Sequence, residues 1–297
     1  MSNEQFNPLV SIVLPTYNRA VEIRKAIDSV VSQDYKNWEL VIVDNHSTDD
    51  TDDVIKSFTN DKIRTVKINN NGSIGKSRNE GVRNSNGEWI AFLDSDDWWY
   101  PTKLSDSLLA VSDATDIIYH DLDIYESREG EVSGSRIIKG KVLNSPVLRS
   151  LLVGGNVIAN SSVMVRKSIL EKSGYISEDM NINPSVDYNT WLKVASVTEN
   201  FKYLPKSLGA YLIHPGGESQ RDMSISMRYA TNAFTQGLSS SDKRIVDRNI
   251  LYVHARYLFK KQNYSESIKV LKECLSFENF TMNLKVIVML VLSIYKK

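Results

Sequence analysis

The chain has 297 residues, and its 36 lysines and arginines are balanced by 36 aspartates and glutamates. A net charge of zero argues against a nucleic-acid binder, which would normally carry a basic surplus. Hydrophobic residues make up 41% and charged residues 24% of the chain. This composition is typical of a globular protein, and the length suits one large α/β domain with an appendage.

The cysteine content and the apolar runs bear on where the protein works. Cys274 is the single cysteine, so no internal disulfide can form and a reducing compartment is expected. Segment 1–8 lacks the apolar core of a secretory signal, and the longest apolar run, 286–294, is about half the length that spans a bilayer. We therefore predict a cytoplasmic protein, with peripheral contact to the inner face of the plasma membrane as a further option.

The first hundred residues alternate between short apolar runs and segments with helical periodicity. This pattern predicts strands at 10–14, 40–43, 63–68 and 89–93, and helices at 21–31, 51–58 and 76–84. Such alternation is typical of a mostly parallel sheet with helices on both faces. In these sheets ligands bind beyond the carboxyl ends of the strands, so we expect the functional site there.

The remainder of the chain is less regular. We predict strands at 117–119 and 163–165, and helices at 168–172 and 187–194. Beyond about residue 222 proline and glycine are almost absent, and the pattern predicts helices. Segment 252–277 resembles a helical hairpin that turns near Gln262 and Asn263.

Acidic residues follow the predicted strand at 89–93. Asp94 and Asp96 stand one residue apart, directly after an apolar strand, where two carboxylates can hold Mg²⁺ or Mn²⁺. A solvated turn is the alternative. A buried strand that runs into several aspartates needs something to compensate their charge, which favours a cation.

Three further residues are candidates for binding a nucleotide. Asp44 ends the second strand and can accept a hydrogen bond from a base N–H, while the nearby Ser47, Thr48 and Asp49 are candidate helix caps. Lys76 and Arg78 follow a glycine-containing loop at a predicted helix start, where cations and free N–H groups suit a diphosphate. A surface charge pair is an equally good interpretation of these two cations.

Five segments in this order resemble glycosyltransferase family 2, whose members are inverting transferases with the GT-A fold. They are VSIVLPTYNR (10–19), LVIVDNHSTD (40–49), GKSRN (75–79), WIAFLDSDD (89–97) and VDY (186–188) with Trp191. The resemblance covers roughly residues 8–220. It implies an α/β GT-A domain at 1–220, with a nucleotide-binding half at about 8–115 and an acceptor half at about 116–220. A helical C-terminal extension would occupy 221–297.

The resemblance implies a role for each matching residue. Asp44 would bind the uracil edge, Asp94 would lie near the ribose, and Asp187 would be the catalytic base. The donor site as a whole would comprise Pro15, Thr16, Tyr17, Arg19, Asp44, Lys76, Arg78, Asp94, Ser95 and Asp96. Asp96 would hold a Mn²⁺ or Mg²⁺ ion that bridges the donor phosphates, with Asp94 and His214 as further candidate ligands. Asn156 and Trp191 are expected at the acceptor, and 160–162 would help to shape its groove.

The implied activity is transfer of a hexosyl or N-acetylhexosaminyl group from a UDP-sugar to an acceptor hydroxyl, forming a β linkage. The acceptor would be a lipid-linked saccharide or oligosaccharide in surface polysaccharide synthesis, such as O-antigen, other lipopolysaccharide or capsule. Three residues depart from the family pattern: Asn45 for an aspartate, His46 for a glycine and Val186 for an acidic residue. An arginine usual before His214 is also missing. These departures leave open a catalytically silent protein that recruits partners through its C-terminal helices.

Two other interpretations concern the loop after the first strand and the last segment of the chain. A nucleotidyltransferase would carry a glycine-rich loop after the first strand, and residues 15–19 contain no glycine. The last segment, 284–295, is apolar and is followed by Lys296 and Lys297. It suits a membrane surface, a core helix or a homodimer contact.

Overall fold

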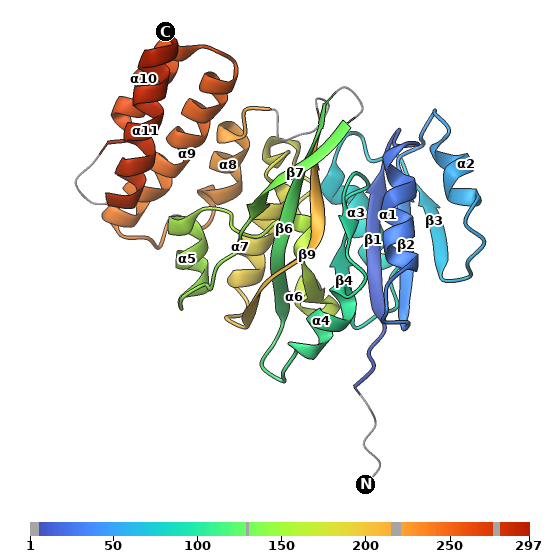
Figure 1. Ribbon diagram of the computed structural model, residues 1–297. Coiled ribbons are helices and arrows are strands. Elements are labelled where there is room, and N and C mark those ends of the chain that lie inside the picture. Colours follow the sequence, from blue (N-terminus) through green and yellow to red (C-terminus); the bar gives the residue numbers. More distant parts are fainter. Residues whose placement is uncertain (1–5, 129–130, 215–220, 276–279) are drawn as a thin grey trace.

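The computed structural model describes residues 6–128, 131–214, 221–275 and 280–297 (Figure 1). The predicted elements of the first hundred residues are all present: β1 (Val10–Thr16), α1 (Glu22–Val31), β2 (Trp38–Asp44), α2 (Thr51–Lys56), β3 (Ile63–Lys67), α3 (Ile74–Arg83) and β4 (Trp89–Phe92). β1 pairs in parallel with β2 and β4, and β2 pairs in parallel with β3. The prediction of a parallel α/β unit is confirmed.

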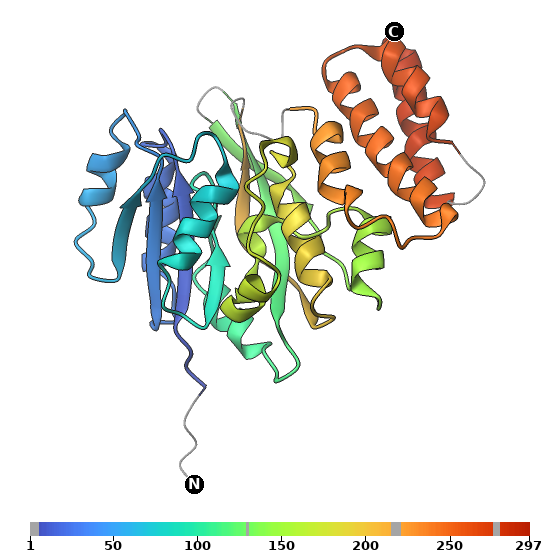
Figure 2. The same ribbon diagram turned by 180° about the vertical axis from the view of Figure 1, so that it is seen from behind.

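The side chains of β1 show why helices cover both faces of this sheet. Successive strand residues point to opposite faces. Ile12 and Leu14 pack with Ile27 of α1, whereas Val13 packs with Val82 of α3. Figures 1 and 2 show α1 and α3 on opposite sides of the sheet. Each face therefore buries one alternate set of β-branched and leucine side chains.

The second half of the chain extends the same sheet. Its elements are β5 (Trp98–Trp99), α4 (Lys103–Leu109), β6 (Ile117–Arg128), β7 (Glu131–Ile138), α5 (Val147–Gly154), the 3₁₀ turn η1 (Asn160–Ser162), β8 (Met164–Arg166), α6 (Lys167–Lys172), the 3₁₀ turn η2 (Met180–Ile182), α7 (Val186–Ala195) and β9 (Phe201–Ile213). The described strands lie in the order β3-β2-β1-β4-β8-β6-β9-β5, with β7 beside β6. β8 runs antiparallel to both β4 and β6.

The strands of this half were predicted only in part. The strand expected at 117–119 continues to Arg128, and β9 was not predicted at all. The polar residues of β6 concealed its length, because a strand is recognised by alternation of apolar and polar residues. In the folded chain β9 supplies their partners: Ser207 Oγ donates to Asp123 at 2.7 Å, and the Tyr203 hydroxyl donates to Asp121 at 2.7 Å.

Four helices follow the sheet: α8 (Ser224–Asn232), α9 (Ser240–Lys260), α10 (Tyr264–Glu273) and α11 (Phe280–Lys296). The hairpin predicted at 252–277 turns where expected, but its first helix begins already at Ser240. Cys274 and Val286 belong to a small apolar cluster shared by α9, α10 and α11. Arg149 of α5 forms an ion pair with Asp242 of α9, at 2.6 Å, and so joins these helices to the sheet domain. Among the helices described, none combines the length and the apolarity that crossing a bilayer requires.

Lys103, in the first turn of α4, is fully buried. Its Nζ has no hydrogen-bond partner among the described residues and lies 4.1 Å from the ring centroid of Trp99. Burial lowers the pKa of this amine to about 7. The unfolded chain therefore binds one more proton than the folded chain between about pH 7 and the ordinary lysine pKa, and folding is penalised most below pH 7.

We expect Lys103→Met to raise the free energy of unfolding by about 2–4 kcal/mol at pH 6, because methionine fills the site without charge. The gain should shrink as the pH rises towards 10, where the unfolded lysine also loses its proton. Urea unfolding at several pH values measures both effects, and the exposed Lys172→Met serves as the control. A gain that is independent of pH would contradict a buried amine whose pKa is lowered.

Candidate functional site

The carboxyl ends of β1 and β2 hold two buried side-chain oxygens that have no hydrogen-bond partner among the described residues. Asp44 is fully buried, and its Oδ1 accepts hydrogen bonds from the Ser47 backbone N–H at 3.0 Å and Oγ at 2.6 Å. Its Oδ2 accepts none from the described residues, and Lys67 Nζ is 4.0 Å away. Thr16 faces Asp44 in the strand register, and its Oγ1 is also buried without a partner. Because buried polar groups are normally paired, this edge has hydrogen-bonding capacity reserved for a ligand.

The other residues predicted near the nucleotide surround this pair. Pro15 is buried within β1, and Tyr17 is 53% exposed just beyond it. The Arg19 backbone N–H donates to Thr51 Oγ1 at 2.8 Å, so this turn is tied to the start of α2. Ser47, predicted as a cap of α2, instead binds Asp44 and receives the Asn18 backbone N–H at 2.9 Å. The β1 turn and the β2 turn therefore form one rigid rim.

A loop between β3 and α3 borders the same rim. Asn45 Oδ1 accepts from the Asn70 backbone N–H at 2.8 Å, and Lys76 Nζ donates to the Asn69 carbonyl at 2.8 Å. Ser73 caps α3 by accepting from the Lys76 backbone N–H at 3.3 Å. Lys76 is thus partly exposed and held to its own loop. The contact of Lys76 with a diphosphate stays a prediction.

Arg78 lies deeper than Lys76 and is bound to Asp94. Its Nη2 is 2.7 Å from Asp94 Oδ1, and only 6% of Arg78 is exposed. Asn160 Nδ2 donates to the same Oδ1 at 2.9 Å. One oxygen of Asp94, Oδ1, thus already accepts from two donors, and its role as a metal ligand stays a prediction. Asn160, which belongs to the segment predicted to shape the acceptor groove, therefore contacts Asp94, which was predicted to lie near the donor.

Asp97 anchors the acidic turn. It is 1% exposed, and its two oxygens accept from Ser161 Oγ at 2.5 Å and the Leu212 backbone N–H at 3.0 Å. Burial raises the pKa of this carboxyl well above its usual value, and the charges of Asp96 and Asp94 add to the effect. Asp97 was not singled out as a site residue from the sequence, and its burial separates it from the partly exposed Asp94 and Asp96.

Asp96 and His214 meet although 118 positions separate them in the chain. His214 Nε2 lies 2.9 Å from Asp96 Oδ2, and both side chains are partly exposed. A carboxylate oxygen and an imidazole nitrogen suit Mn²⁺, and the carboxylate suits Mg²⁺. Within the described segments no group of three or more His, Cys, Asp or Glu side chains is gathered for a metal. A divalent ion here would therefore take most of its ligands from phosphate oxygens and water.

Asp187 lies in the first turn of α7. The Tyr188 backbone N–H donates to its Oδ1 at 2.7 Å, and Asn156 Nδ2 donates to its Oδ2 at 3.2 Å. Burial raises the pKa of this carboxyl, and the charge of Arg78 opposes that shift. The charge of Asp94 also acts on Asp187 and raises its pKa. The predicted base therefore lies within electrostatic reach of the Arg78–Asp94 pair, beside the exposed Asn156.

The prediction that Trp191 contacts the acceptor is wrong. Trp191 is fully buried, its ring packs on Phe92 at 6.2 Å between centroids, and its Nε1 donates to the Ile158 carbonyl at 3.2 Å. It lies one helical turn after Asp187. Its function in this fold is to fix α7 against the sheet, which sets the orientation of Asp187.

The departures from the family pattern have structural explanations. His46 adopts φ of +53°, a left-handed conformation in which a glycine would be unstrained and histidine is uncommon. Asn45 supports the neighbouring loop, as described above. Val186 is 2% exposed and packs in the main core. None of the three removes Asp44, Asp96 or Asp187 from the site.

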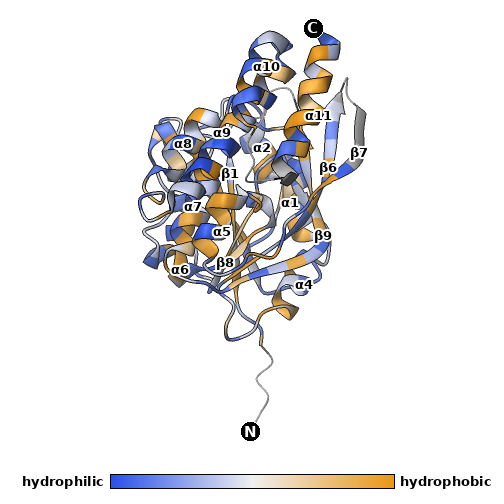
Figure 3. Ribbon diagram, turned by 90° about the vertical axis from the view of Figure 1, so that its left-hand side faces the viewer, coloured by the Kyte–Doolittle hydropathy of each residue, from blue (hydrophilic) through white to orange (hydrophobic). Residues whose placement is uncertain are grey.

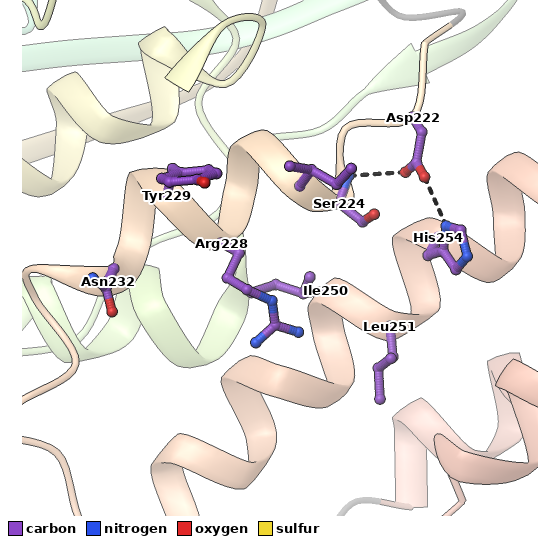
Figure 4. A pocket seen from close by; sticks show the side chains of 9 residues that line it. Asp222, Ser224, Arg228, Tyr229, Asn232, Ile250, Leu251 and His254 are labelled. Carbon is purple, nitrogen blue, oxygen red and sulfur yellow. Dashed lines mark hydrogen bonds and ion pairs between the residues drawn. The ribbon is translucent and has the colours of Figure 1, made fainter. Parts of the chain in front are cut away.

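A pocket of about 600 Å³ lies between α8 and α9 (Figure 4). Ile225, Tyr229 and Leu251 contribute apolar surface, and His254 Nδ1 lies 2.7 Å from Asp222 Oδ2 at one end. None of the nine described residues that line it was predicted as a site residue. The pocket is separate from the rim that carries Asp44 and Asp96.

The amino-acid sequence of the chain is similar to those of known proteins. Residues 11–174 match the sequence profile of Glycosyl transferase family 2. An uncharacterized glycosyltransferase of Rickettsia typhi is 32% identical over 219 residues, which make up 70% of this chain and 66% of that protein, slightly under two thirds of its length. The Escherichia coli UDP-Glc:alpha-D-GlcNAc-diphosphoundecaprenol beta-1,3-glucosyltransferase WfaP is 29% identical over 188 residues, or 63% of this chain and 70% of WfaP.

Solved structures share the architecture at lower sequence identity. Staphylococcus aureus TarS 1–349 in complex with UDP-GlcNAc aligns with a TM-score of 0.63 and 18% identity, over 97% of this chain and 87% of TarS 1–349. The mannosyltransferase PcManGT of Pyrobaculum calidifontis, in complex with GDP-Man and Mn²⁺, aligns with a TM-score of 0.61 and 17% identity, over 98% and 82%. These likenesses concern the fold.

Proposed function

Because the chain belongs to glycosyl transferase family 2 and has the GT-A fold, we propose that it is an inverting, metal-dependent transferase. It moves a hexosyl or N-acetylhexosaminyl group from a UDP-sugar to an acceptor hydroxyl. The main support is the position of Asp44 at the end of β2, the contact of Asp96 with His214 just after β4, and the electrostatic interaction of Asp187 with Arg78 and Asp94. The bound ligands named for TarS and PcManGT agree with a nucleotide-sugar donor and a divalent ion.

Each group has a task that its surroundings suit. Asp44 Oδ2 accepts a hydrogen bond from the uracil N–H, because it is buried and otherwise unpartnered. Asp96 and His214 would hold Mn²⁺ or Mg²⁺, which would offset the charge on the departing diphosphate. Asp187 takes the proton of the acceptor hydroxyl. Attack from the side opposite the leaving group turns an α-linked donor into a β-linked product.

The acceptor class is argued from the relatives. WfaP acts on a diphosphoundecaprenol-linked sugar, and a Bacillus subtilis protein named for teichuronic acid biosynthesis, TuaG, is 36% identical over 105 residues, or 35% of this chain and 42% of TuaG. We therefore propose a lipid-linked saccharide acceptor in surface polysaccharide synthesis, O-antigen or capsule, at the cytoplasmic face of the membrane.

The test is a panel of UDP-sugars with Mn²⁺ and a synthetic lipid-diphosphate saccharide, with products detected by mass spectrometry. We expect the sugar of one donor to be transferred to the acceptor. Without the acceptor, that donor should be hydrolysed more slowly than it is transferred when the acceptor is present. UDP binding by calorimetry without turnover of any donor would instead favour a silent binding protein. No UDP binding at all, with or without Mn²⁺, would contradict the proposal.

Asp44→Asn should weaken UDP binding about tenfold or more, because the amide turns a hydrogen-bond donor towards the base N–H. Asparagine keeps the size of the side chain and an oxygen for Ser47, so folding is retained. Calorimetry gives the Kd, and the exposed Asp53→Asn in α2 is the matched control. Equal affinity of the Asp44 variant and wild type would show that the base lies elsewhere.

A further inference from the structure

Helix α11 exposes a continuous apolar face. Its members occupy the side of the helix that points away from the rest of the protein: Leu284, Ile287, Val288, Val291, Leu292, Ile294 and Tyr295. Each is between 44% and 87% exposed. Figure 3 shows α11 as a mostly orange helix at the outer edge of the molecule. A helix that is apolar on all sides normally has another surface against it.

The opposite side of α11 is already used within the chain. Val286 is fully buried and belongs to the apolar cluster with Leu271 and Cys274 of α10, and Ser293 is also fully buried. Their contacts leave the apolar face of α11 pointing outwards. Packing within the chain therefore buries one side of α11 and leaves its other side exposed to a binding partner.

The charges around this face are almost all positive. Residues 280–297 contain Lys285, Lys296 and Lys297 and no acidic residue. Lys296 Nζ lies 5.7 Å from the ring centroid of Phe259, near the end of α9.

Lys260, which is exposed in the last turn of α9, lies within electrostatic reach of Arg256 and Arg136. The acidic residue that also acts on Lys260 is Glu126, and it forms an ion pair with Arg136. Arg136, Arg256, Lys260 and Lys296 are called the cationic corner below.

The C-terminal end of α11 lies at the same end of the molecule as the carboxyl end of β1. In Figure 1 β1 runs upwards from the N-terminal tail, so its carboxyl end is at the top, where the C-terminus also lies.

We propose that the apolar face of α11 and the cationic corner together bind the surface of an anionic lipid bilayer. Apolar side chains enter the boundary between headgroups and acyl chains, and lysines and arginines pair with lipid phosphates. α11 of a second copy would offer no acidic residue to neutralise the lysines, which favours lipid over a homodimer. This proposal deepens the proposed function, because it supplies the surface that presents the acceptor.

Vesicle sedimentation of the full chain tests it. We expect the protein to pellet with vesicles containing phosphatidylglycerol, to remain in solution with phosphatidylcholine alone, and to be released by high salt. Val291→Glu should weaken binding at least about tenfold, because a charge replaces an apolar group at the contact. Leu109→Glu in α4, also an exposed apolar residue, is the matched control and should bind like wild type.

A charge variant tests the second half of the surface. Lys260→Glu with Lys296→Glu should weaken binding to anionic vesicles by about fivefold or more for each residue, whereas Lys172→Glu should not. Circular dichroism confirms that each variant is folded. Failure of wild type to pellet with anionic vesicles, or unchanged binding of both Val291→Glu and the double lysine variant, would overturn the proposal.

Self-association and activity are measured separately. If wild type fails to bind vesicles and light scattering finds a dimer that Val291→Glu dissociates, a second copy covers α11 and the lipid proposal is wrong. Donor hydrolysis in solution needs no membrane. Failure of the proposed transferase function would therefore appear in that assay, whatever the outcome of the sedimentation.

Discussion

Asp187→Asn should reduce turnover about 10²–10⁴-fold, because the amide cannot take the proton of the acceptor hydroxyl. The affinity for UDP should stay within about twofold of wild type, since Asp187 lies on the acceptor side. Asparagine still accepts the Tyr188 N–H through its oxygen, which preserves the first turn of α7. The matched control is Asp28→Asn on the exposed side of α1.

The pH dependence gives an independent measurement of the same role. Burial raises the pKa of Asp187, and Arg78 holds it down. The acid limb of kcat/KM should therefore lie above the ordinary aspartate range, because the base works only when it is deprotonated. Arg78→Met should move this limb to higher pH, since removal of the guanidinium raises the pKa further. Wild-type turnover in Asp187→Asn would contradict the role of Asp187 as the catalytic base. So would an acid limb of kcat/KM that stays at the same pH in the Arg78→Met variant.

Asp96→Ala should lose about 10²–10³-fold in turnover and should shift the Mn²⁺ titration to higher concentration. The variant removes the carboxylate that pairs with His214 and leaves the histidine without that partner. UDP binding measured with Mn²⁺ and with a chelator separates metal loss from misfolding: the variant should bind UDP equally in both conditions, whereas wild type should bind more tightly with Mn²⁺.

His214→Ala should have a smaller effect in the same direction, because the charged carboxylate makes the stronger contact with the ion. Asp53→Asn, a surface aspartate of α2, is the control for loss of negative charge. If Asp96→Ala keeps the metal stimulation of wild type, the divalent ion is held by other groups, and the proposed role of the Asp96–His214 pair must be abandoned.

The sequence by itself determined the α/β class and the edge at which the site is found. β1, β2 and β4 are mostly apolar runs, and the residues that the strand-end rule selects stand at or just beyond their ends: Thr16, Asp44 and Asp94. The β6–β9 pairing was missed because its polar residues are satisfied only across strands far apart in the chain.

Only the tertiary structure decided which polar groups are free and which are already paired. Asp94, Asp96 and Asp97 look alike in sequence, yet one binds Arg78, one meets His214 and one is buried against Ser161. The buried position of Trp191 and the outward apolar face of α11 were decided in the same way. The physical reason is that the burial and the charge of a side chain depend on distant segments that fold against it, whereas local periodicity records only the element to which it belongs.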